Sequence, residues 1–180
     1  MTKSEIDKEL AGKGDYVQID TIRRYLKENI PAEMKKFASL KLIALYEGRS
    51  MFAEAAFLYN TLIELAANYQ ERMDFLVKEI EDFIRAGFFD RADGVMNKIT
   101  AEMKPMEKTK YTSAIKGFYM AQGLAYERQK RKGKAIEVYE KMVGMKGMSS
   151  PEMEEVKARL LVLYKELGLT QKYFQLSGKN

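Results

Sequence analysis

The feature that most constrains the fold is an internal repeat in which an aromatic residue and an alanine recur at a fixed offset. An alanine stands nine positions after each of three aromatic residues, and a fourth aromatic residue continues the series without one. Successive aromatic residues are roughly 40 positions apart, a period typical of arrays of helical hairpins. The aromatic residues are Tyr46, Phe83, Tyr126 and Tyr164, and the alanines are Ala55, Ala92 and Ala135.

Apolar residues follow helical spacing along most of the chain, as in the groups that begin at Phe37 and Phe75. No sustained alternation typical of strands occurs, and only 3 prolines interrupt 180 residues. Stop and start signals such as Gly87 and Ser150-Pro151 divide the helices from one another. We predict helices over residues 18–29, 32–47, 51–68, 71–86, 89–103, 111–131, 134–145, 151–167 and 170–176.

This pattern resembles the tetratricopeptide repeat family, whose motif is Trp-x2-Leu-Gly-x2-Tyr, then Ala-x3-Phe, then Pro. The best match is Tyr119-x2-Gln122-Gly123-x2-Tyr126, followed by Ala135-x3-Tyr139. A small alanine lets two helices approach closely, while the aromatic residue fills the groove beside it. No hairpin can bury its apolar face alone, so the units must stack. The resemblance covers about residues 36–176 and implies a right-handed α-solenoid.

The sequence therefore predicts one all-α domain over residues 18–176, with tails at residues 1–17 and 177–180. The polar segment Lys104–Lys110 is the best candidate for a flexible joint within that domain. The predicted repeat units span residues 36–69, 73–103, 111–147 and 151–176.

Composition argues against catalysis. The chain has neither cysteine nor histidine, so the most common nucleophilic, general-base and transition-metal side chains are missing. Carboxylates gather at Glu79, Glu81 and Asp82 and again at residues 152–155. Adjacent helical positions do not face one another, so we expect these groups to be solvated or to cap helices. We expect no enzymatic activity, no cofactor and no metal site.

The N-terminus lacks the apolar core of a secretory signal, and no later stretch is apolar enough to span a membrane. These features favour a cytoplasmic protein without membrane association.

The first helix of each pair is predicted to carry a second apolar face. Within residues 71–86, Val77 and Ile84 lie roughly opposite Leu76 and Phe83. An apolar strip with charged margins suits a groove for an amphipathic helix or peptide. We therefore predict a protein-binding adaptor or scaffold. Its concave groove is predicted to comprise Phe37, Leu40, Ala44, Val77, Glu81, Ile84, Arg85, Met120, Leu124, Glu127, Arg128 and Val162.

Nucleic-acid binding is the second hypothesis. A basic run at one predicted turn supplies candidate contacts to phosphate or to an acidic partner, namely Lys130, Arg131, Lys132 and Lys134. The net charge of +5 is a mild indication, because 26 acidic residues are interleaved with 31 basic ones. The aromatic residues lie at core spacing, not where bases would stack, so a solvated turn is the favoured interpretation.

The sequence does not exclude two other occupants of the groove. The first is the N-terminal helix, with Ile19, Ile22, Leu26 and Ile30 on one stripe, and the second is another copy of the chain in a homo-oligomer. One subclass of the resembling family clamps a partner's terminal carboxylate with lysine, arginine and asparagine. That role is not expected here, because the matching positions are mostly apolar: Leu40, Ala44, Val77, Glu81, Met120 and Leu124.

Overall fold

The computed structural model describes residues 2–178, which form helices and no strand. The chain groups into two compact units, Met1–Pro105 and Met106–Asn180. The single domain expected over residues 18–176 stays a prediction. The division lies inside the predicted joint Lys104–Lys110. Met1, Lys179 and Asn180 lie outside the described residues. The predictions for the two tails are therefore compared with the structure only at residues 2–17 and 177–178.

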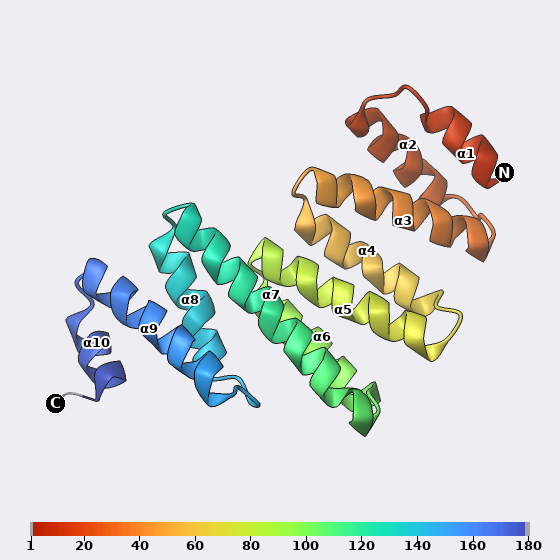
Figure 1. The fold of residues 1–180 in the computed structure, drawn as a ribbon. Helices are drawn as coiled ribbons and strands as arrows, with labels where there is room; N and C mark the ends of the chain where they lie inside the picture. The colour runs from red at the N-terminus through yellow and green to blue at the C-terminus, as the bar shows by residue number, and fades with distance from the viewer. Residues whose placement is uncertain (1, 179–180) are drawn as a thin grey trace. The chain divides into compact units, whose positions relative to one another are not determined.

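The first unit contains three helical pairs and the second contains two (Figure 1). The helices of the first unit are α1 (Lys3–Leu10), α2 (Asp15–Lys27), α3 (Ala32–Gly48), α4 (Phe52–Glu64), α5 (Tyr69–Ala86) and α6 (Phe89–Glu102). A 3-10 turn, Pro105–Glu107, follows. The helices of the second unit are α7 (Lys108–Arg128), α8 (Lys132–Val143), α9 (Ser150–Glu166) and α10 (Thr170–Ser177).

All nine predicted helices are present, with ends displaced by a few residues. The largest differences have a local cause. Asn68 caps α5 by accepting a hydrogen bond from the Glu71 amide at 2.9 Å, so α5 begins at Tyr69 and α4 ends at Glu64. Because an N-cap residue has a non-helical backbone conformation, Asn68 cannot also belong to the preceding helix.

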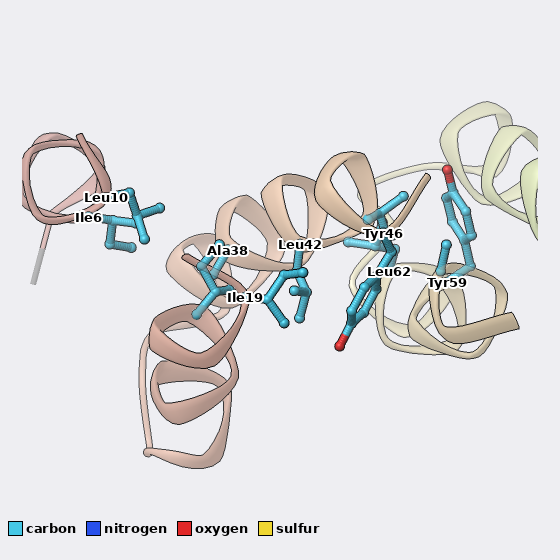
Figure 2. Close-up of a cluster of buried hydrophobic side chains, with 11 residues drawn as sticks. Ile6, Leu10, Ile19, Ala38, Leu42, Tyr46, Tyr59 and Leu62 are labelled. Carbon is cyan, nitrogen blue, oxygen red and sulfur yellow. The ribbon is translucent and has the colours of Figure 1, made fainter. Parts of the chain in front are cut away.

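Residues 1–17, predicted as a flexible tail, contain helix α1 and the start of α2. Thr2 and Glu5 form a capping box at the start of α1. Ile6 and Leu10 are buried in a cluster with residues of α2, α3 and α4, and Figure 2 shows side chains from these four helices. The signals were present in the sequence as Thr-x-x-Glu followed by apolar residues four positions apart, but the helix is only eight residues long.

The turns inside four of the helical pairs have one geometry, which shows that the repeat is structural. In each turn, the residue four positions after the repeat aromatic has a positive φ: Ser50, Gly87, Lys130 and Gly168. The next residue donates its amide hydrogen to the carbonyl of that aromatic at 2.8 Å in every case. This is the hydrogen bond of a Schellman-type helix end. Two of the four left-handed positions are filled by residues other than glycine.

Replacing Lys130 with glycine should therefore stabilise the second unit. A side chain at positive φ costs about 1 kcal/mol, because Cβ approaches the following carbonyl. Lys130 has φ 58°, whereas its neighbour Gln129 has φ −79°. Urea unfolding followed by circular dichroism should show a gain for Lys130→Gly and none for the control Gln129→Gly. Equal stabilities of the two variants would contradict this account of the turn.

In the first unit, the first helices of successive pairs run parallel, with α4 packed against both α3 and α5 (Figure 1). Lys36 near the start of α3 forms an ion pair with Glu71 near the start of α5. Glu47 near the end of α3 faces Asp82 near the end of α5. Helix α1 runs parallel to α3 in the same sense, since Lys3 pairs with Glu33 and Asp7 with Lys41. Helices α1 and α2 thus both pack on α3.

Candidate functional site

The alanines of the sequence repeat lie on the buried side of each hairpin. Ala55, Ala92 and Ala135 have no exposed surface, and each lies on the second helix of its pair. In the second unit, Gly123 of α7 lies directly against the ring of Tyr139, where a Cβ atom would come within 2.6 Å of Cζ. Small residues at these positions allow the two helices to approach closely.

The residues predicted to line a partner groove divide between the two units. In the first unit, Leu40 is 42% exposed, Ala44 and Arg85 are exposed, and Val77 and Glu81 are half-buried. Neighbouring residues of α3, including Leu42 and Ile43, are buried in the core. The parallel helices α3 and α5 therefore present a partly apolar, solvent-facing surface, which we call the α3–α5 face and define by Leu40, Ala44, Val77 and Glu81.

In the second unit, the matching positions also reach solvent. Val162 is 58% exposed, Met120 and Leu124 are half-buried, and Arg128 is exposed. Glu127 is engaged within the unit, because it binds Arg159 of α9 at 3.2 Å. These residues lie on α7 and α9.

Of the residues predicted for the groove, Ile84 is buried and Phe37 is partly buried. Ile84 has no exposed surface. Ile84 directly follows Phe83 and is rotated about 100° around the helix axis from it. Its apolar side chain therefore packs in the interior of the unit. Phe37 packs against the N-terminal core cluster, and the ammonium groups of Lys3 and Lys41 lie over its ring. Helix α1, which the sequence prediction missed, supplies part of that environment.

The N-terminal helix α2 does not cover the α3–α5 face. Its Ile19 and Ile22 belong to the same buried cluster as Ala38 and Leu42 of α3, which are core residues. Leu40 stays substantially exposed beside them. The alternative in which this helix fills the groove is therefore not what the structure contains.

The carboxylates of α5 are not all solvated, contrary to the sequence prediction. Glu79 and Asp82 are each 1% exposed, and one oxygen of each has no hydrogen-bond partner among the described residues. Burial raises the pKa of Glu79 to about 7, opposed by the charge of Lys98 and a hydrogen bond from Asn60. Glu79 and Asp82 are three residues apart, so they share one face of the helix, and both α4 and α6 pack against α5.

The prediction for residues 152–155 agrees with the structure. Glu152 forms a capping box with Ser149 at the start of α9 and binds Lys116 of α7 at 2.7 Å. Hydrogen bonds from Lys116 and from Ser149 lower the pKa of Glu152 to about 2. Glu154 and Glu155 are exposed.

A hydrogen-bonded tyrosine and glutamate pair recurs in both units. Tyr59 donates its phenol hydrogen to Glu47 at 3.3 Å, and Tyr139 donates to Glu127. The partners are twelve residues apart in each pair, and each joins the end of a first helix to the second helix of the same pair. Burial is the main cause that raises the pKa of both tyrosines. This pair is not among the residues predicted from the sequence, although its equal spacing in both units is a detectable signal.

The basic turn between α7 and α8 is largely engaged within the second unit. Lys132 pairs with Glu166 at 3.2 Å, and Lys134 pairs with Glu137 at 2.6 Å. The guanidinium of Arg131 lies over the Tyr126 ring. Lys130 is exposed. These contacts favour the solvated turn over a phosphate site.

Comparisons with the known protein families, with curated proteins and with solved structures found no match for this chain. Between residues 2 and 178, no helix has the length and apolar character needed to cross a membrane. In the same range, no three acidic side chains are arranged to hold a metal ion.

Proposed function

We propose that the chain is a protein-binding adaptor or scaffold that docks a peptide or an amphipathic helix on the α3–α5 face. The observation that carries this proposal is that Leu40 and Ala44 of α3 are exposed and Val77 of the parallel helix α5 is half-buried, although Leu42 and Ile43 of α3 are buried. Burying such an apolar strip against a partner removes it from water, and charged groups at its margin, such as Glu81 and Arg85, fix the partner's register.

Peptide-display selection on the full chain tests this proposal. The selected peptides should carry apolar residues at helical spacing, because the face is an elongated apolar strip. Introducing a charge at the centre of the strip, Leu40→Asp, should weaken their binding by about tenfold or more, since the carboxylate would be desolvated without a partner. The melting temperature should stay unchanged because Leu40 is exposed.

The matched control is Leu167→Asp, an equally exposed leucine at the end of α9 in the other unit. It should leave peptide binding unchanged. Selected peptides that bind the Leu40→Asp variant as tightly as the parent would show that the binding surface lies elsewhere.

A further inference from the structure

The second unit contains a cavity of about 300 Å³ where α8, α9 and α10 meet. Its apolar lining comes from all three helices: Val143 of α8, Leu160 of α9 and Leu176 of α10. Leu160 is buried, whereas Val143 and Leu176 are half-buried. The cavity therefore reaches from the surface to the core of the unit. An apolar hollow of this size with a few polar groups is the usual form of a small-ligand site.

The polar lining of the cavity is an ion pair and a phenol. Tyr164 donates its phenol hydrogen to Glu140 Oε1 at 2.7 Å, and Lys172 Nζ lies 2.7 Å from the same oxygen. Burial opposes ionisation of Glu140, but the hydrogen bonds from Lys172 and Tyr164 lower its pKa. The carboxylate is therefore charged at neutral pH. Both contacts are to Oε1, so Oε2 can accept a hydrogen bond from a ligand.

The corresponding groove of the first unit is more closed. Counted from the repeat aromatic of each pair, Val143 matches Ile63 of α4, and Leu176 matches Val95 of α6. The two residues of the first unit are buried, at 8% and 4% exposed, whereas their two counterparts are half-buried. Helix α6 has 14 residues and α10 has 8. The shorter helix covers less of the groove between neighbouring second helices, so the cavity has a structural cause.

The size and charge of the cavity define the kind of group that it can hold. In other proteins, an apolar cavity of roughly 150 Å³ holds one benzene ring, so this cavity has room for two fused rings. Glu140 and Lys172 neutralise each other, and a charged ligand would have to separate this pair. A neutral ligand leaves the pair intact and needs only one donor for Glu140 Oε2.

We propose that this cavity binds a neutral, two-ring aromatic group that carries one hydrogen-bond donor, of which indole is the simplest example. The rings pack against Val143, Leu160 and Leu176, and the indole N–H donates to Glu140 Oε2. The group can belong to a free small molecule or to a tryptophan side chain of a partner. The site lies in the second unit and does not depend on the α3–α5 face of the first.

The test is a titration of the full chain with indole. The chain contains no tryptophan, so the fluorescence of the indole itself reports binding. A saturable change is expected. The control ligand 1-methylindole keeps the two rings but has no N–H, and it should bind about tenfold more weakly, because it cannot donate to the carboxylate. Equal affinities of the two ligands would overturn the assignment of a donor to Glu140.

Two variants that fill the cavity locate the site. Leu176→Phe and Val143→Phe add volume from two different helices, and each should weaken indole binding by about tenfold or more. The matched control Leu169→Phe adds the same ring at the start of α10, outside the cavity lining, and should leave binding unchanged. Circular dichroism checks that each variant is folded. Absence of saturable binding to the parent, or binding that survives both filling variants, would overturn the site.

Further arms separate the two sources of the ring and the two surfaces of the chain. A peptide, acetyl-Gly-Trp-Gly-amide, that binds more tightly than indole would indicate a partner side chain, and the reverse order would indicate a free small molecule. Leu40→Asp should not change indole binding, since Leu40 belongs to the first unit. Loss of indole binding in that variant would place the ligand on the α3–α5 face and overturn the cavity site.

Discussion

Replacing Ala135 with leucine is expected to lower the unfolding free energy of the second unit by about 1–3 kcal/mol, the typical cost of forcing extra methylenes into a packed core. Ala135 has no exposed surface, and α7 and α8 approach closely enough for Gly123 to lie against the Tyr139 ring. A leucine at position 135 would have to push the two helices apart. Urea unfolding followed by far-ultraviolet circular dichroism measures the loss.

The matched control for this prediction is Ala121→Leu on α7. Ala121 is exposed, so the added side chain meets solvent and the change in stability should stay within about 0.5 kcal/mol. If Ala135→Leu were as stable as Ala121→Leu, the close contact between the two helices would not be a feature of the folded chain.

Replacing Glu79 with glutamine is expected to stabilise the first unit in a way that depends on pH. Burial raises the pKa of Glu79 from 4.5 to about 7, so between these values the folded chain holds a proton that the unfolded chain has released. The parent therefore loses stability as pH rises through this range, because the folded state must bury an ionised carboxylate. The variant lacks this loss.

The difference in unfolding free energy between Glu79→Gln and the parent should be near zero at about pH 4 and should reach about 1–3 kcal/mol in favour of the variant at about pH 8. Lys98 and Asn60 reduce the effect, since both favour the ionised carboxylate. Denaturant unfolding at several pH values gives this difference directly. The exposed Glu64→Gln serves as control, and a difference for Glu79→Gln that does not change with pH would refute the assignment.

The sequence by itself determined the helices and their pairing. Helical periodicity and local caps placed nine of the ten α-helices found between residues 2 and 178, because those signals act over a few residues. The offset of nine positions from aromatic to alanine identified one repeated hairpin, and the structure repeats its turn at Ser50, Gly87, Lys130 and Gly168. Two of those positions carry no glycine, so composition alone did not reveal that the turns are equivalent.

Only the tertiary structure decided which polar groups are buried and which apolar groups are exposed. Glu79 and Asp82 resemble surface charges in the sequence, yet both are buried in the folded unit, where α4 and α6 pack against α5. Ile84 resembles a groove residue, yet it is buried, while Leu40 on a similar pattern reaches solvent. The physical reason is that burial depends on which helix packs against each face. That contact joins residues distant in sequence, as Glu47 and Asp82 do across α3 and α5.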